Sequence, residues 1–239
     1  MAVNDFLNEL SNIENKLINI LPKLIDRLKG FSDTELAVIA REIDFFEQLN
    51  KLGYNDSVEK LMQDYDGVAE NVFREANIRG LDTKVASASQ LQLIKDLDAQ
   101  AIFRIGQEIS TKVKSELLRG IIDGDTRDNI VNRLSTTVVG ELTSPQLNTI
   151  VGDSFARFSN TATKKAFEEN PDQRFKYVGA SKENPRIRPL CKHVMSNSQN
   201  EKGFTVAEIL SYPEIGGLKL SFSGRGGYNC RHDWVAVLD

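Results

Sequence analysis

Hydrophobic residues recur at intervals of three and four through the first 170 residues, which is the spacing typical of amphipathic helices. Pro22 lies inside the first run and is expected to kink or divide that helix. Glycines such as Gly30 are expected to end the runs, and capping residues to begin them, as the capping box of Ser32 with Glu35 and the cap at Thr126 do. The pattern predicts successive helices over approximately residues 6–30, 32–53, 56–80, 87–120, 126–139 and 144–170. We interpret their apolar stripes as parts of a core.

The pattern changes after Pro171, where short alternating runs replace the helical spacing. Phe175–Val178, Leu218–Phe222 and Trp234–Val237 are predicted as strands because they alternate and contain residues that favour strands. Thr205 with Glu208 forms a capping box that predicts a helix of one or two turns. The glycine-rich stretch 223–228 is expected to be irregular.

These patterns predict a mostly α fold with an elongated helical body and a small C-terminal α+β module. The helical body covers residues 1–170, with 1–80 and 81–170 as candidate sub-bundles, and the module covers 171–239. A module of this size has little core of its own, so we expect it to be stabilised either by a bound metal ion or by firm docking onto the helices. The absence of a Gly/Ser linker at the junction favours docking.

Composition and charge indicate an ordinary folded protein. Of 239 residues, 40% are hydrophobic and 27% charged, which excludes a disordered chain, and no apolar run approaches the about 20 residues of a membrane span. The net charge of -4 gives no overall attraction to nucleic acid. The N-terminus lacks the features of a secretory signal, so we expect maturation in a cytoplasm and no membrane partner.

The chain has two cysteines and two histidines, and all four lie between residues 186 and 232 as two Cys-x-His pairs. They are Cys191, His193, Cys230 and His232. Two thiolates and two imidazoles form the ligand set of a structural zinc site, and in an extended segment residues i and i+2 project to the same side. Two other interpretations stay open. The cysteines are small buried hydrophobes beside ordinary histidines, or they form a disulfide, which a reducing cytoplasm disfavours.

The C-terminal region resembles the Mu protein F-like head morphogenesis proteins of tailed bacteriophages. The resemblance rests on the strand Phe175–Val178, the stretch Asn-Pro-Arg-Ile-Arg-Pro-Leu-Cys over 184–191, and Asn-Cys-Arg-His over 229–232 before an apolar strand. The family usually has an acidic residue at the position of Asn184, a histidine shortly before Asn229 and a cysteine at the position of His232. The matching motif residues, to which the resemblance gives a structural role, are Arg186, Arg188, Pro189, Asn229 and Arg231.

The resemblance implies a minor capsid protein without enzymatic activity, present as several copies in an assembly. It would act in procapsid assembly, DNA packaging or ejection, and its partners would be the portal, the major capsid protein and packaged DNA. It would assemble in the host cytoplasm and lie in the capsid interior near the portal. Because an amphipathic helix at a chain end readily serves as a docking face, we expect Leu10, Leu17 and Leu24 to contact the portal or another subunit.

Two rival functions are considered. A zinc-stabilised nucleic-acid-binding protein would use Arg225 and Tyr228 to hold phosphates and stack a base. A hydrolase would use a Cys/His pair or zinc, with Glu183 as a candidate acid-base group, but no His-Glu-x-x-His signature is present. Arg186, Arg188 and Arg231 also have a simpler interpretation, in which they pair with acidic residues and hold loops in place. The candidate partners are Glu183, Glu201, Glu208 and Asp233.

Overall fold

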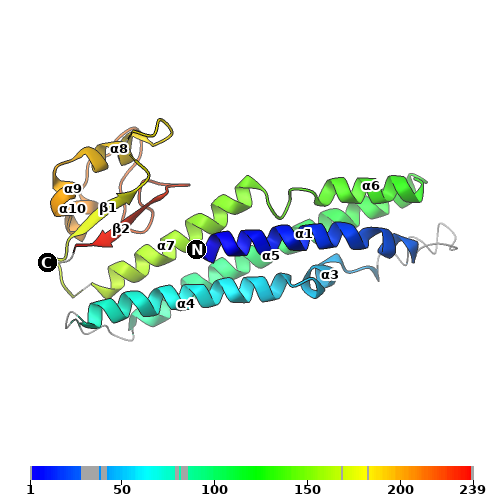
Figure 1. Ribbon diagram of the computed structural model, residues 1–239, viewed down its shortest axis with the longest axis horizontal. Coiled ribbons are helices and arrows are strands. Elements are labelled where there is room, and N and C mark those ends of the chain that lie inside the picture. The colour runs from blue at the N-terminus through cyan, green and yellow to red at the C-terminus, as the bar shows by residue number, and fades with distance from the viewer. Residues whose placement is uncertain are drawn as a thin grey trace. The chain divides into compact units, whose positions relative to one another are not determined.

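A computed structural model describes residues 2–27, 38, 42–78, 81, 86–167, 169–181 and 183–237. The fold is mostly α with a small two-stranded sheet near the C-terminus, which confirms the predicted fold class (Figure 1). The helices are α1 (Ala2–Asp26), α3 (Phe45–Lys51), α4 (Tyr54–Ile78), α5 (Ala86–Ile122), α6 (Arg127–Val138), α7 (Pro145–Ala166), α8 (Pro189–Ser196), α9 (Gln199–Lys202) and α10 (Val206–Leu210). The strands are β1 (Phe175–Gly179) and β2 (His232–Ala236).

The chain forms two compact units. The first comprises Met1–Met62 and Asp98–Asn148, and the second comprises Gln63–Leu97 and Thr149–Asp239. The unit boundaries therefore fall within α4 and α5, and near the start of α7. The division predicted at residue 170 stays a prediction. None of the helices in the described ranges is long and apolar enough to cross a membrane.

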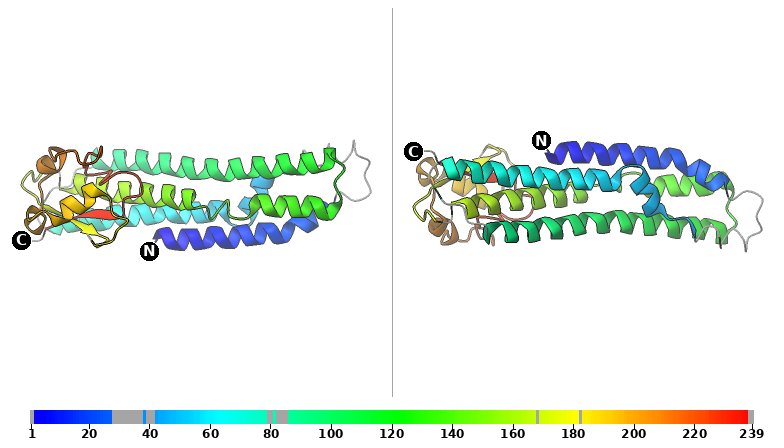
Figure 2. Two further views of the ribbon diagram at one scale, coloured as in Figure 1. Left: turned by 90° about the horizontal axis from the view of Figure 1, so that it is seen from above. Right: turned by 90° about the horizontal axis from the view of Figure 1, so that it is seen from below.

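In the first unit, α1 packs against α6 and α3, and both views in Figure 2 show α1 beside α6. Leu10, Leu17 and Leu24 of α1 are 0%, 1% and 5% exposed, so they belong to the core of this unit. The prediction that they form a docking face is therefore wrong. The physical reason is that the apolar stripe of α1 is already covered by other parts of its own chain, among them α6 and α3.

Two buried polar contacts connect the elements of the first unit. The Glu14 carboxylate on α1 accepts hydrogen bonds from the backbone N–H groups of Gly140 and Leu142 at 2.9 and 3.0 Å, just after α6. The Tyr54 hydroxyl of α4 donates to the Ile102 carbonyl of α5 at 2.7 Å. These contacts satisfy polar groups that would be costly to bury unpaired.

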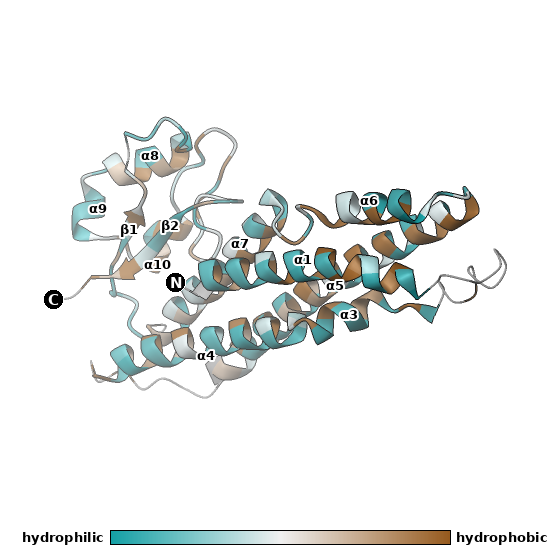
Figure 3. Cartoon of the chain, turned by 45° about the vertical axis from the view of Figure 1, so that its right-hand side comes forward, coloured by the Kyte–Doolittle hydropathy of each residue, from teal (hydrophilic) through white to brown (hydrophobic). Residues whose placement is uncertain are grey.

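The observed helix boundaries follow local capping chemistry. Thr126 caps α6 by accepting from the Asn129 N–H, and the Ser144 hydroxyl accepts from the Leu147 N–H at the start of α7, as predicted. Pro22 does not divide α1, which runs as one helix from Ala2 to Asp26. The predicted end near Gly30 and the capping box at residues 32 and 35 lie outside the described residues. Figure 3 shows hydrophobic and hydrophilic residues along the same helices.

The second unit holds the small sheet. Strands β1 and β2 pair antiparallel, with Phe175 opposite Ala236 and Gly179 opposite His232. Their inward side chains join an aromatic core that also contains Ala76 of α4 and Phe167, the residue after α7. The ring of Phe167 packs edge-on against Phe175 at a centroid distance of 5.9 Å. The module therefore shares its core with the helices of its own unit.

Three local structures of the C-terminal module differ from the predictions. Helices α8 and α9 were not predicted, and Pro189 occupies the first turn of α8, where its missing N–H costs nothing. The stretch Leu218–Phe222 is not a strand, because Leu218 and Ser221 make only isolated bridges to Ile215 and Arg225. Its alternation reflects the burial of Leu220 and Phe222 in the aromatic core of the second unit. The capping box predicted for α10 is confirmed.

Candidate metal centre

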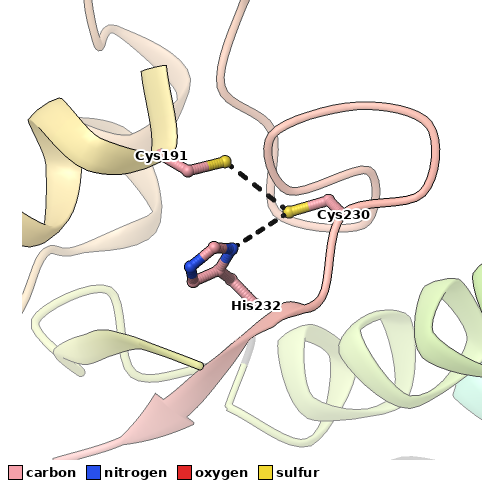
Figure 4. Close-up of side chains that lie close together, drawn as sticks. All are labelled: Cys191, Cys230 and His232. Atoms are coloured by element: carbon pink, nitrogen blue, oxygen red, sulfur yellow. Dashed lines mark hydrogen bonds between the residues drawn. The ribbon is translucent and has the colours of Figure 1, made fainter. Parts of the chain in front are cut away.

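Cys191, Cys230 and His232 converge in the second unit (Figure 4). Cys191 lies in the first turn of α8, Cys230 lies in the loop before β2, and His232 begins β2. The two sulfurs are 3.7 Å apart, and the Cys230 sulfur is 3.5 Å from His232 Nδ1. All three side chains are buried, with exposures of 2%, 6% and 3%. Two residue types that bind soft and borderline metal ions thus share one buried cluster.

Local backbone structure explains how Cys230 and His232 come together. The chain is extended as it enters β2, so residues 230 and 232 project to the same side. Just before them, Asn229 has a φ of 55°, in the left-handed region that asparagine adopts more readily than most residues. Its backbone N–H donates to the Asp153 carboxylate of α7 at 2.5 Å. This hydrogen bond from Asn229 to α7 therefore holds the turn that orients Cys230.

Arg188 and Gly226 bring Cys191 to the same point. The Arg188 guanidinium, immediately before α8, donates to the backbone carbonyls of Gly226, at 2.9 Å, and Tyr228. Gly226 passes so close to the sulfurs that a Cβ there would lie 2.3 Å from the Cys191 Sγ. Such a separation is far below van der Waals contact, so this position requires glycine.

The His232 ring is held in a defined orientation. Its Nε2 lies 3.2 Å from the Ala180 carbonyl oxygen, which can only accept, so Nε2 carries the proton in the neutral ring. Nδ1 is then the lone-pair atom directed at the cysteines, which is the arrangement that metal-binding histidines use. The ring also stacks on Tyr177, with centroids 4.9 Å apart and planes at 12°.

The cluster favours one thiolate. A hydrogen bond from Cys191 lowers the pKa of the Cys230 thiol to about 3, and hydrogen bonds from the Tyr177 hydroxyl and the His232 backbone N–H act in the same direction, whereas burial acts against them. The same hydrogen bond, together with burial, raises the pKa of Cys191. Burial also raises the pKa of the Tyr177 phenol, whose oxygen lies 3.3 and 3.2 Å from the two sulfurs. Tyr177 is therefore held as a neutral phenol beside the two sulfurs.

The spacing of the cluster fits a zinc ion. Tetrahedral zinc with Zn–S bonds of about 2.3 Å and a Zn–N bond of about 2.0–2.1 Å would place two sulfurs about 3.8 Å apart and a sulfur and a nitrogen about 3.6 Å apart. The corresponding distances here are 3.7 and 3.5 Å. The remaining pair of ligand atoms is the Cys191 Sγ and the His232 ring nitrogen. Their distance is at most 4.8 Å, against about 3.6 Å in a tetrahedral site, so this pair fits less strictly. These residues could hold one divalent ion, leaving its fourth position to solvent or to the Tyr177 oxygen.

His193 does not join this group, which corrects the predicted set of four ligands. It is exposed and packs edge-on against Tyr212, with ring centroids 6.0 Å apart. The prediction assumed an extended segment, but residues 191 and 193 lie on a helix, where positions two apart point about 200° away from each other. Only the second Cys-x-His pair is extended.

Arg225 is a structural residue rather than a nucleic-acid contact. It is 4% exposed, and its guanidinium pairs with the carboxylates of Asp153 and Asp233 at 3.4 and 3.3 Å. It also donates to the His232 carbonyl at 3.1 Å. A buried, paired side chain cannot reach a phosphate, so the nucleic-acid role predicted for Arg225 is wrong. Tyr228 is 62% exposed and remains accessible.

The loop-holding interpretation of the arginines is partly supported. Arg188 holds the loop, but through backbone carbonyls instead of acidic side chains. The predicted partner Asp233 does pair, with Arg225, whereas Glu208 pairs with Arg174 at 3.3 Å. The motif residues Arg186, Arg188, Asn229 and Arg231 all line one cavity next to the thiols. Pro189 begins α8.

Sequence reasoning missed Asp153, Asn160, Tyr177 and Gly226. Asn160 accepts from the Trp234 N–H at 3.1 Å, and Asp153 binds the Asn229 turn, so α7 holds both the loop and β2. The sequence pattern of α7 does not indicate that its side chains contact residues some 70 positions later in the chain. Gly226 left a usable signal, since glycine can mark a site where another part of the chain approaches the backbone closely.

No family model, no curated protein and no solved structure matches the chain.

Proposed function

We propose that the protein is a minor head protein of a tailed bacteriophage, which acts with the portal in procapsid assembly, DNA packaging or ejection. One observation carries this proposal. The two stretches that carry the resemblance, 184–191 and 229–232, lie almost 40 residues apart in the chain yet form the walls of one cavity and one thiol-imidazole cluster. If the resemblance of the two stretches were due to chance, they would not be expected to lie side by side in the fold.

In this proposal the cluster holds a structural metal ion. The module has only two short strands and three short helices among its described residues, and its core depends on α4 and α7. An ion bound by Cys191, Cys230 and His232 would join α8, the loop and β2 at one point. Metal binding would then contribute directly to the free energy of folding of the module. The role is one of holding a binding surface in shape.

A zinc hydrolase fits the same cluster less well. A catalytic zinc site needs an acid-base group near the open position. Among the described residues that line the cavity, none is a carboxylate, and Glu183, the predicted candidate, bonds with Ser181 outside that lining. A Cys/His pair would need an accessible nucleophile, whereas both sulfurs are buried. We therefore favour assembly over catalysis.

The proposal is tested by co-expression with the portal and major capsid proteins encoded in the same genome. The full-length chain should co-purify with portal rings or appear inside procapsids. A Cys191→Ser/Cys230→Ser variant tests whether the cluster is needed, and a Lys192→Gln variant is the matched control on the same helix. A folded, metal-loaded protein that joins neither partner would contradict the proposal.

A further inference from the structure

The cavity beside the thiol-imidazole cluster has its own chemistry. It has a volume of about 360 Å³ and is lined by Asn184, Arg186, Arg188, Asn229 and Arg231 in addition to the cluster itself. Arg186, Asn229 and Arg231 are exposed, so solvent and solutes reach the cavity. Its volume lies near the lower end of the about 300–1,000 Å³ typical of small-molecule sites. A small polar ligand, or one end of a larger one, fits this space.

The charge of the cavity is strongly one-sided. Three of its lining residues are arginines, and within the described lining there is no aspartate or glutamate. One cysteine thiolate would offset only one of these charges. Nearby Arg225 shows the contrast, because its buried guanidinium is matched by two carboxylates. Acidic side chains thus neutralise Arg225, whereas the lining of the cavity holds no acidic side chain for Arg186, Arg188 and Arg231.

The three arginines have different tasks. Arg188 already donates two hydrogen bonds to the carbonyls of Gly226 and Tyr228, so it supplies charge in a fixed position. Among the described residues, Arg186 and Arg231 have no side-chain hydrogen bond or ion pair, and they reach the lining from two different segments, one before α8 and one before β2. Their guanidinium groups are free to bind an anion in the bidentate manner that arginine favours.

We propose that this cavity binds a phosphate group through Arg186 and Arg231, with Arg188 fixing one wall. Several guanidinium groups around one space offer more donors than the two oxygens of a carboxylate accept, and they match the oxygens of a tetrahedral phosphate. The phosphate belongs either to a small phosphorylated molecule or to a nucleic acid. This inference goes beyond the head-protein proposal and does not depend on the portal.

Isothermal titration calorimetry on the full-length protein at low salt tests the proposal with three probes. These are inorganic phosphate, a 5′-phosphorylated single-stranded DNA dodecamer and the same dodecamer with a 5′-hydroxyl. The test variant is Arg186→Gln/Arg231→Gln, and the matched control is Lys192→Gln, an exposed cation next to Cys191 that does not line the cavity. Metal content and melting temperature are measured on each sample, so that loss of the fold is recognised.

We expect the wild type to bind at least one probe, with affinity about tenfold or more weaker in the double arginine variant and unchanged in Lys192→Gln. Preference for the 5′-phosphate over the 5′-hydroxyl dodecamer would assign the site to a nucleic-acid end. Equal binding of both dodecamers would assign it to backbone diesters, and binding of inorganic phosphate alone to a small molecule. The proposal is overturned if no probe binds, or if both variants behave alike.

Discussion

At the residue level, Gly226 sets how closely the two sulfurs approach. We predict that Gly226→Ala destabilises the second unit by about 1–3 kcal/mol, because the new Cβ would lie 2.3 Å from the Cys191 sulfur and displace it. Any metal bound there would be lost as well. Chemical denaturation measures the change. Gly152→Ala in α7, where an added Cβ meets nothing within 4 Å, is the control and should be neutral or slightly stabilising.

Substitution of each histidine distinguishes a metal site with three protein ligands from one with four. We predict that His232→Ala removes bound zinc whereas His193→Ala retains it, since only His232 directs a ring nitrogen at the sulfurs. Elemental analysis of the purified variants gives the ratio of zinc to protein. Equal loss of zinc in both variants would restore the set of four ligands, and a zinc-free wild type would remove the site altogether.

Arg225 is a buried cation that is paired with two carboxylates. We predict that Arg225→Met lowers the free energy of unfolding by about 2 kcal/mol, because Asp153 and Asp233 would lose their shared counter-charge. This figure is below that of a fully buried pair because both carboxylates are partly exposed. Arg119→Met, which breaks an exposed pair with Glu116, should change stability by less than about 0.5 kcal/mol. Similar losses in the two variants would refute the assignment.

At the level of elements, local chemistry determined what the sequence could predict. The helix starts at Thr126 and Pro145 and the capping box of Thr205 were predictable because a few adjacent residues define each of them. Helix α8 was missed because its hydrophobic pattern covers only two turns. That single error also misplaced His193, since the two-residue spacing was interpreted as extended.

Helix α7 and strand β2 are joined by Asn160, which is 2% exposed. Its side chain accepts from the Trp234 N–H at 3.1 Å and donates to the Ala156 carbonyl at 2.7 Å. We predict that Asn160→Ala costs about 1–3 kcal/mol, because a buried strand N–H loses its partner. Thermal melting would show the loss, with Thr136→Ala, an exposed helical residue, as the control. A melting temperature equal to that of the control would contradict this role.

At the level of the whole molecule, the sequence predicted the fold class and three of the residues in the cluster, but it did not predict how the chain closes around them. Asp153 and Asn160 act on residues more than 70 positions away, and no local pattern encodes such a contact. The buried state of Leu10, Leu17 and Leu24 was equally unavailable, because an apolar helical stripe looks the same whether its own chain or a partner covers it.

Removal of metal should affect the two units unequally. We predict that a chelator makes the chain between Arg186 and Arg231 sensitive to trypsin, while fragments of the first unit persist, because the cluster lies entirely within the second unit. Mass spectrometry of timed digests locates the cuts, and added zinc should reverse the effect. Identical digestion with and without chelator would show that no ion supports this module.

The hydrogen bond between Arg188 and residue 228 uses a backbone carbonyl, and the Tyr228 side chain stays exposed. The identity of that side chain is therefore separate from the contact that closes the loop. Position 228 can accept a cysteine carrying a dye or a cross-linker while the carbonyl still receives its hydrogen bond. A probe attached there would report from the edge of the arginine-lined cavity, in assembled particles as well as in the free protein.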